Sequence, residues 1–126
     1  MLKEIFLVML IFFAGCAAPK GAGGAEGELN DALHSGKPVL LYFHSDSCPY
    51  CKYQMPIVEE LKRGYEGRTI VLIIDADKNR DMLRKYGQFG YLPAIVFFNS
   101  TAPVAHTYIG LTQKPVLEEK LNGLLK

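Results

Sequence analysis

The sequence predicts an α/β fold in which helices cover both faces of a mixed central sheet. Apolar and β-branched runs indicate strands at residues 39–43, 69–74, 94–98 and 104–109. Helical spacing of apolar side chains indicates helices at residues 28–35, 48–62, 79–86 and 114–125. A helix separates the first two strands, which should therefore run parallel, whereas the short turn at 99–103 makes the last two an antiparallel hairpin. The expected order is β-α-β followed by β-β-α.

Each of these elements has a local justification in the sequence. The run 39–43 is apolar or aromatic throughout, as expected of a strand that is buried on both faces. In the first helix Leu29, Ala32 and Leu33 share one face, and the glycine and proline that follow end the helix. The last helix is amphipathic through Val116, Leu117, Leu121, Leu124 and Leu125. These patterns supply the two apolar surfaces that a sheet between helices requires.

The first residues have the composition of an export signal. Residues 1–15 combine an early lysine with an apolar run from Ile5 to Phe13, which is shorter than the roughly 20 residues of a membrane-spanning helix. The run leads into Phe13-Ala14-Gly15-Cys16, which resembles a bacterial lipobox, so Cys16 is expected to be lipidated and to anchor the chain to a membrane. Alternatively, Cys16 only lies near an ordinary cleavage site. Both interpretations predict an exported protein on the periplasmic or extracytoplasmic side.

The rest of the chain has the composition of one small globular domain. Of 126 residues, 49% are hydrophobic and 21% are charged, which is enough apolar material for one core. The 14 basic and 13 acidic residues nearly balance and no nucleic-acid-binding motif is present, so nucleic acid is excluded as a partner. Residues 16–27, rich in alanine and glycine, are expected to be a flexible tether, which leaves 28–126 as the folded domain.

A cysteine pair, Cys48-Pro49-Tyr50-Cys51, follows the first expected strand and opens the next helix. Two cysteines three residues apart lie on one face of a helical turn, so their sulfurs can form a disulfide without large backbone movement. A thiol at a helix start lies beside unpaired amides and the positive end of the helix dipole, which can lower a cysteine pKa from about 8.5 to roughly 3.5–7.5. Cys48 is therefore expected to be a nucleophile, with Cys51 as the resolving thiol.

From about Lys37 onward the chain resembles the thioredoxin superfamily in four ordered signals. These are Cys48-x-x-Cys51, then Pro56, then Lys85-Tyr86-Gly87 leading to Tyr91-Leu92-Pro93-Ala94, and finally Gly110 after the last strand. The resemblance implies the thioredoxin fold, with a helix-kinking proline at Pro56 and a cis proline at Pro93 facing the disulfide. It also implies a thiol-disulfide oxidoreductase that needs no cofactor besides its redox-active cysteine pair.

The same resemblance implies how a partner is held. With a cis bond between Leu92 and Pro93, the backbone of Leu92 faces the cysteines and can pair with an extended substrate chain by strand addition. Pro49 and Tyr50 are expected to contact the substrate at the rim of the site. The expected partners are protein thiols and disulfides and a membrane-bound or soluble redox partner, and the domain is expected to act as a monomer.

Three positions depart from the thioredoxin pattern. Ser47 stands where thioredoxins carry a tryptophan, and Tyr42 and Ile73 stand where they carry the aspartate and lysine of a proton relay. The proton of the resolving cysteine must then pass to water, to the other cysteine, or to a loop group such as His44 or Asp46. The thioredoxin-like body and the tether favour a reductant, whereas the missing relay leaves an oxidant open. The tetrapeptide is that of glutaredoxins, but glutathione as a substrate does not follow from it alone.

A copper or other metal carrier on the same fold is the alternative hypothesis. Its ligands would be Cys48 and Cys51, joined by a histidine such as His44 or His106. Carriers of this kind on thioredoxin folds more often have three residues between the cysteines, and a structural zinc site needs four ligands. The oxidoreductase, with no bound metal, is therefore the favoured hypothesis.

Overall fold

The computed structural model describes residues 24–126, so the expected signal peptide and the expected lipidation site at Cys16 lie outside the described residues. In chain order the elements are α1 (Gly24–Leu33), β1 (Val39–His44), α2 (Cys51–Gly64), β2 (Ile70–Asp75), α3 (Arg80–Tyr86), β3 (Ala94–Phe98), β4 (Val104–Ile109) and α4 (Lys114–Leu124). Among the described helices, none combines the length and the apolar character that a membrane span would require.

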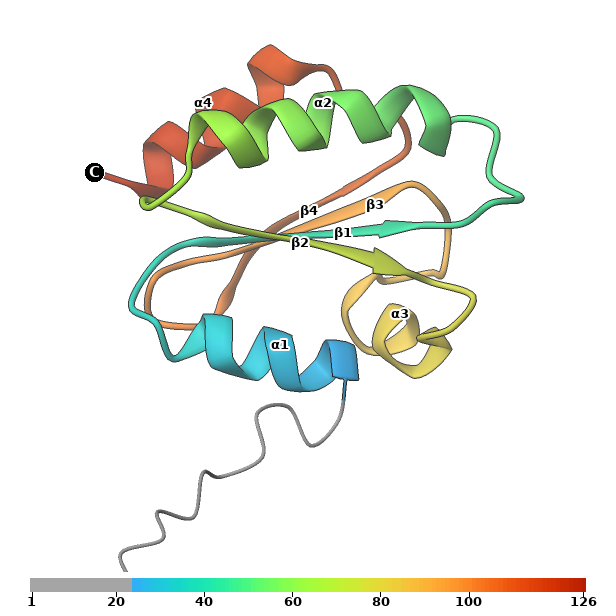
Figure 1. The fold of residues 1–126 in the computed structure, drawn as a ribbon, viewed down its shortest axis with the longest axis horizontal. Coiled ribbons are helices and arrows are strands. Elements are labelled where there is room, and N and C mark those ends of the chain that lie inside the picture. The colour runs from blue at the N-terminus through green and yellow to red at the C-terminus, as the bar shows by residue number, and fades with distance from the viewer. Residues whose placement is uncertain (1–23) are drawn as a thin grey trace, which may run out of the picture.

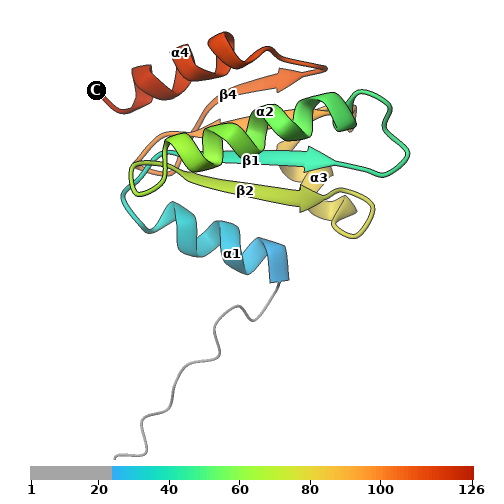
Figure 2. The same cartoon turned by 45° about the horizontal axis from the view of Figure 1, so that its top comes forward.

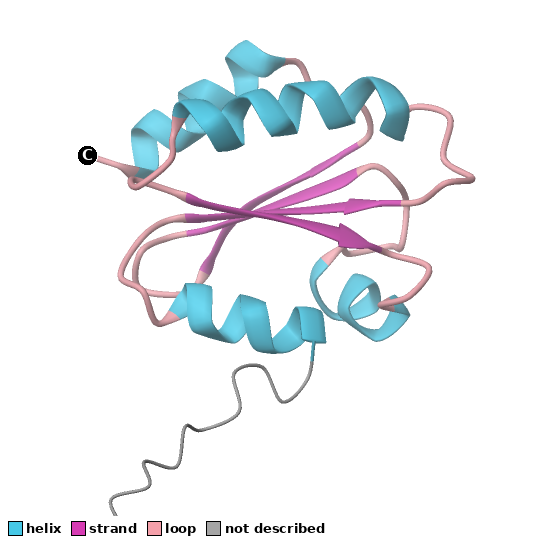
Figure 3. Ribbon diagram, viewed as in Figure 1, coloured by secondary structure: helices cyan, strands magenta, loops and turns pink. Residues whose placement is uncertain are grey.

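The four strands form one mixed sheet in the order β2-β1-β3-β4, which is drawn in magenta in Figure 3. β1 runs parallel to β2 and antiparallel to β3, and β3 runs antiparallel to β4. The register places Phe43 of β1 between Ile74 of β2 and Ala94 of β3. The ends of β1 and β2 and the start of β3 therefore meet at one end of the sheet. This topology confirms the predicted fold class.

Helices cover both faces of the sheet. α2 and α4 lie over one face, and α1 and α3 lie over the other (Figures 1 and 2). Because successive side chains of a strand point to opposite faces, Leu41 and Phe43 of β1 join the core under α1 and α3, whereas Leu40 and Tyr42 join the core under α2 and α4. Residues 39–43 are fully buried, as the apolar run predicts.

Helix α1 begins four residues earlier than the sequence predicts. Residues 24–27, which the sequence assigns to the tether, form the first turn of this helix. Ala25 packs against the core under α1 and α3, and Glu26 Oε1 accepts a hydrogen bond of 3.2 Å from Lys85 Nζ at the end of α3. These tertiary contacts give the glycine- and alanine-rich segment a helical start that its own propensity does not indicate.

Helix α2 begins later than the sequence predicts, at Cys51 instead of Cys48. Cys48, Pro49 and Tyr50 form the turn that precedes it, and the Cys51 N–H donates to the Cys48 carbonyl oxygen at 3.2 Å. Pro49 cannot donate a backbone hydrogen bond, which suits it to the turn at a helix start. Cys48 therefore lies just before the helix, and Cys51 is its first residue.

Candidate active site

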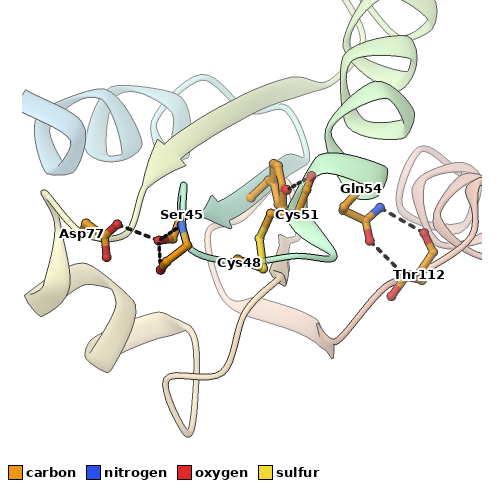
Figure 4. Close-up of a disulfide and its surroundings, with 8 residues drawn as sticks. Ser45, Cys48, Cys51, Gln54, Asp77 and Thr112 are labelled. Atoms are coloured by element: carbon orange, nitrogen blue, oxygen red, sulfur yellow. Dashed lines mark hydrogen bonds between the residues drawn. A yellow bond between two sulfur atoms is a disulfide. The ribbon is translucent and has the colours of Figure 1, made fainter.

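The loop between β1 and α2 carries the cysteine pair at the end of the sheet where β1 stops. Cys48 and Cys51 form a disulfide, with their Cα atoms 5.3 Å apart (Figure 4). Cys51 lies in the first turn of α2 and is only 4% exposed, whereas Cys48 lies in the loop and is partly exposed. A partner can therefore approach Cys48 more easily than Cys51.

The start of α2 offers unpaired backbone amides close to the disulfide. The Tyr50 carbonyl oxygen accepts hydrogen bonds from the N–H groups of Tyr53 and Gln54, at 3.1 and 3.0 Å. Within residues 24–126, the N–H groups of Tyr50 and Lys52 have no hydrogen-bond partner. Together with the positive end of the helix dipole, such amides favour a negative charge beside them. This is the environment that stabilises a thiolate at Cys48.

A hollow with a volume of about 610 Å³ opens beside the disulfide. His44 at the end of β1, loop residues 45–49, and Lys52, Met55 and Pro56 of α2 line it. Both cysteines border the hollow, and Lys52 is the one lysine or arginine in its lining. The hollow therefore joins the sulfur atoms to an open and largely uncharged surface.

The segment before β3 reaches the same end of the sheet. The peptide bond between Leu92 and Pro93 is cis, and the Pro93 carbonyl oxygen accepts a hydrogen bond of 2.8 Å from the Gly110 N–H. Ala94 pairs with Phe43, which places Pro93 level with the loop that carries Cys48. Within residues 24–126, the backbone N–H and C=O of Leu92 have no hydrogen-bond partner. A second chain could therefore bond to the backbone here.

The thioredoxin family model matches residues 25–123, which is most of the chain and includes the disulfide, the hollow and the cis proline. The chain belongs to the thioredoxin family. Because thioredoxins act through such a cysteine pair, this family member is a thiol-disulfide oxidoreductase with a C-x-x-C motif, as the sequence predicts.

Individual thioredoxins are similar to this family member over most of their length. The thioredoxin of Buchnera aphidicola subsp. Baizongia pistaciae is 37% identical over 94 residues, which are 75% of this chain and 84% of that protein. The solved structure of a mutant thioredoxin from Halobacterium salinarum has a TM-score of 0.69 at 27% identity, over 79% of this chain and 84% of that one.

A larger relative is also similar to this thioredoxin family member. The thiol:disulfide interchange protein TxlA homolog of Synechocystis is 31% identical over 100 residues. These residues are 77% of this chain but only 54% of that protein, so the chain spans about half the length of this relative.

Tyr42 stands at the position of the relay aspartate of thioredoxins, and it forms a hydrogen bond with the first residue of α2. The Tyr42 hydroxyl donates a hydrogen bond of 3.1 Å to the Cys51 carbonyl oxygen. Burial raises the pKa of Tyr42 to about 12. The phenol therefore stays neutral near pH 7 and cannot replace the relay aspartate as a base. His44 lies next to it, with the two ring centroids 5.7 Å apart, and lines the hollow.

In this family member the segment that leads to Cys48 is attached to the end of β2 by a polar network around the buried Ser45. Ser45 is 4% exposed, and its hydroxyl donates a hydrogen bond of 2.6 Å to Asp77 Oδ2 (Figure 4). A carboxylate can only accept hydrogen bonds, so the hydroxyl hydrogen of Ser45 is used in the bond to Asp77. In the 3.0 Å contact between the two serines, the Ser47 hydroxyl must therefore be the donor and Ser45 Oγ the acceptor. The Ser45 carbonyl in turn accepts from the Cys48 N–H at 3.1 Å.

A second hydrogen-bond network attaches α2 to the segment after β4. Gln54 is fully buried, and its side chain makes both hydrogen bonds of an amide pair with the backbone of Thr112. Its Nε2 donates to the Thr112 carbonyl at 3.0 Å, and its Oε1 accepts from the Thr112 N–H at 2.7 Å (Figure 4). Gln54 thereby connects the turn of α2 after Cys51 to the loop that follows Gly110.

Sequence reasoning missed both networks. Ser45, Asp77, Gln54 and Thr112 are ordinary polar residues in the sequence, and the partners are 32 and 58 positions apart. A glutamine on the apolar side of the predicted second helix was the one signal that could have pointed to a buried amide.

The predicted site residues come together in part. The structure brings Cys48, Pro49 and Cys51 to the hollow, and Tyr50 is 59% exposed beside them. His106 of β4 pairs with Phe97 of β3 and does not line the hollow. Within residues 24–126, no three histidine, cysteine or acidic side chains are grouped so that they could hold a metal ion. The carrier hypothesis therefore gains no support.

Proposed function

We propose that this oxidoreductase exchanges disulfides with exported proteins, with Cys48 as the nucleophile and Cys51 as the resolving thiol. The observation that carries the assignment is the unequal exposure of the two cysteines at the start of α2. Cys48 is partly exposed beside unpaired amides, whereas Cys51 is almost completely buried. A nucleophile must meet its partner, and a resolving thiol must only reach the other cysteine.

In the reducing direction the reaction consists of two exchanges. The Cys48 thiolate attacks one sulfur of the partner disulfide, so that a Cys48–partner bond forms and the other partner sulfur leaves as a thiolate. Cys51 loses its proton and attacks Cys48 Sγ, which forms the Cys48–Cys51 disulfide and releases the second partner thiolate. Two electrons pass from the dithiol to the partner, and the redox-active disulfide is the only cofactor required. His44, which lines the hollow with Cys51, is a candidate acceptor of that proton.

The backbone of Leu92 holds the partner chain in this proposal. Its N–H and C=O have no partner within the described residues and lie where β3 begins, level with the loop of Cys48. An extended segment of the substrate can bond to these two groups while the mixed disulfide exists. Pro93 sets the direction of that backbone, and Pro49 and Tyr50 contact the segment from the side of α2. The domain acts as a monomer.

Trapping of mixed disulfides tests the two cysteine roles. We expect Cys51→Ser to accumulate disulfides with proteins of the exporting cell, because no resolving thiol remains. Cys48→Ser should form none, and the double variant serves as the background control. The species are resolved on non-reducing gels and disappear with a reductant. Accumulation with Cys48→Ser but not with Cys51→Ser would reverse the assignment.

The location and the direction of electron flow are further parts of the proposal. The apolar run before Cys16 supports export and a lipid anchor at that cysteine, and the thioredoxin-like body supports a reductant that is recharged by a membrane-bound or soluble partner. We expect radiolabelled fatty acid to be incorporated into the full chain and to be lost in Cys16→Ala. A cytoplasmic, unlabelled protein would contradict this. Equilibration with glutathione gives the reduction potential, and a value near about −120 mV instead of −270 mV would indicate an oxidant.

A further inference from the structure

The carboxylate of Asp77 lies at a fixed position beside the loop between β1 and α2. Asp77 comes two residues after the end of β2, and its N–H donates to Asp75 Oδ1 at 2.9 Å. The Ala76 N–H donates to the His44 carbonyl oxygen at 2.8 Å, which joins this turn to the end of β1. Ser45 Oγ contacts Asp77 Oδ2 at 2.6 Å (Figure 4). Backbone hydrogen bonds therefore hold the turn of Asp77 against the loop.

The hydroxyl of Ser45 uses all of its hydrogen-bonding capacity in this contact and two others. A hydroxyl has one hydrogen to donate and two lone pairs that accept. The hydrogen of Ser45 is used in the bond to Asp77. The lone pairs accept from the N–H of Ser47 at 3.3 Å and from its hydroxyl at 3.0 Å. The donors therefore follow one direction, from Ser47 through Ser45 to Asp77.

This direction affects the cysteine that follows Ser47. Ser47 and Cys48 are neighbours in the chain, and both line the hollow. Because the hydroxyl hydrogen of Ser47 is used in the bond to Ser45, it is not available to a thiolate at Cys48. A hydrogen bond donated to the charged form of an acid stabilises that form. The network that attaches the loop to β2 therefore also limits how readily Cys48 loses its proton.

No other charged side chain of the described residues takes part in this network. The further titratable groups at its two ends are His44, Asp46 and Lys52 in the hollow, and Glu26, Lys78, Arg80 and Asp81 around a recess of about 370 Å³ beside Asp77. Within residues 24–126, none of them forms a hydrogen bond with Ser45 or Ser47. The ion pairs of this part of the chain also leave Asp77 out. Asp77 is therefore the acid that sets the direction of donation.

We propose that the Asp77 carboxylate fixes the direction in which the two serine hydroxyls donate, and thereby withholds a hydrogen-bond donor from the Cys48 thiolate. Asp77 is thus a positioning residue, because it acts on Cys48 through the serines. The inference rests on the proposed function, in which Cys48 is the attacking thiolate. A less stable thiolate makes the reduced form less stable and the reduction potential more negative, which suits a reductant.

An amide in place of the carboxylate frees the network to reverse. The N–H group of an asparagine can donate to Ser45 Oγ, which a carboxylate cannot do. The Ser45 hydroxyl can then donate to Ser47, and the Ser47 hydroxyl can donate to the thiolate of Cys48. The bond between Ser45 and position 77 is kept in this reversed network, so the loop stays attached to the end of β2.

The test measures the acidity of Cys48 in variants of the full chain. Asp77→Asn removes the charge and keeps a partner for Ser45. Asp75→Asn is the matched control, because Asp75 ends β2 and, within residues 24–126, its carboxylate accepts only from backbone N–H groups. Ser47→Ala, alone and combined with Asp77→Asn, removes the donor assigned to the thiolate. Alkylation of Cys48 by iodoacetamide in the reduced protein is followed against pH by peptide mass spectrometry, which separates it from the other cysteines.

We expect Asp77→Asn to lower the pKa of Cys48 by about 0.5 to 1, and Asp75→Asn to lower it by less than about 0.3. Ser47→Ala alone should leave this pKa within about 0.2 of the wild type, because its hydroxyl does not donate to Cys48 there. Combined with Asp77→Asn, it should reduce the change to that of the control. The reduction potential of Asp77→Asn should become less negative, whereas loss of the loop attachment alone would make it more negative.

Two results would overturn this role of Asp77 and leave the exchange reaction intact. One is a change in Asp77→Asn no larger than in Asp75→Asn, because the loss of charge alone would then explain it. The other is a full change that persists when Ser47→Ala is added, because Ser47 would then not be the donor. A wild-type protein in which iodoacetamide modifies Cys51 before Cys48 would instead contradict the proposed function.

Discussion

The two cysteines lie three residues apart but are held in different ways. Cys51 is part of a 14-residue helix. Tyr42 of β1 donates a hydrogen bond to the Cys51 carbonyl, and Gln54 of the same helix bonds to the backbone of Thr112. Cys48 lies in a loop that is attached to the sheet through one side-chain network, from the buried Ser45 to the exposed Asp77. The reactive side of the site is therefore held by a few polar contacts, and the resolving side by regular secondary structure.

The redox state of the cysteine pair changes how firmly the loop of Cys48 is attached. In the oxidised protein the bond between Cys48 and Cys51 connects the loop to the helix directly. In the reduced protein that connection is gone, and the network of Ser45 is what keeps the loop against the end of β2. Interactions of the loop should therefore matter more for the dithiol than for the disulfide, whereas interactions of the helix should matter equally for both.

The largest expected effect is on the helix side. Gln54→Leu keeps the volume of the side chain but leaves the N–H and C=O of Thr112 without their partner, which should cost about 3 kcal/mol of unfolding free energy. Urea titration measures the loss, which should be equal in the oxidised and the reduced protein, so that the reduction potential stays constant. Gln113→Leu is the matched control, because Gln113 is exposed and its side chain makes no capping hydrogen bond. A neutral Gln54→Leu would contradict the buried network.

The next effect is on the loop side and depends on the redox state. Ser45→Ala removes the donor to Asp77 and should destabilise the reduced protein by about 2 kcal/mol, but the oxidised protein by less. Because the variant destabilises the reduced form more than the oxidised form, the reduction potential should become more negative. The shift should be roughly 20 mV for each 1 kcal/mol by which the two losses of stability differ. Equilibration with glutathione measures the potential. Ser100→Ala, at an exposed turn position, is the control, and an equal loss of stability in both redox states would remove the distinction between the two sides.

The smallest effect at neutral pH concerns Tyr42. Tyr42→Phe removes the hydrogen bond to Cys51 and should cost about 1 kcal/mol. Burial raises the pKa of Tyr42 to about 12 from the ordinary 10.0, so the folded state holds the phenol proton more tightly than the unfolded chain does. The contribution of this proton is fully present below about pH 10 and is lost as the pH rises toward 12. The wild type should therefore lose its advantage over Tyr42→Phe in that range.

Unfolding titrations of both proteins at several pH values between about 8 and 11.5 test this prediction. The other tyrosines and the lysines are identical in the two proteins, so their titration cancels in the difference. A difference that stays constant across this range would mean that Tyr42 ionises normally.

The fold could be predicted because each strand and helix carries a local pattern. The apolar run 39–43 by itself indicates a strand that is buried on both faces. The short turn at 99–103 predicts that the last two strands pair as an antiparallel hairpin. The predicted ends were less accurate, because contacts from other elements decide them. The pairing of Glu26 with Lys85 helps to extend α1 toward the N-terminus, and the turn at Pro49 delays the start of α2 until Cys51.

The sequence alone identifies residues that combine a specific chemistry with a fixed spacing. These are the cysteine pair, the proline of the cis peptide bond, and Tyr42 and Ile73, which replace the relay residues of thioredoxins. The tertiary structure alone decided which ordinary polar residues hold that chemistry in place. Ser45 meets Asp77 and Gln54 meets Thr112 only after the strands have paired. The tertiary structure also decides that Phe89 and Tyr91 are exposed to solvent, because other phenylalanines and tyrosines of this chain are buried in the core. A hydrogen bond or an exposed ring depends on the distance between atoms, and folding sets that distance between residues far apart in the chain.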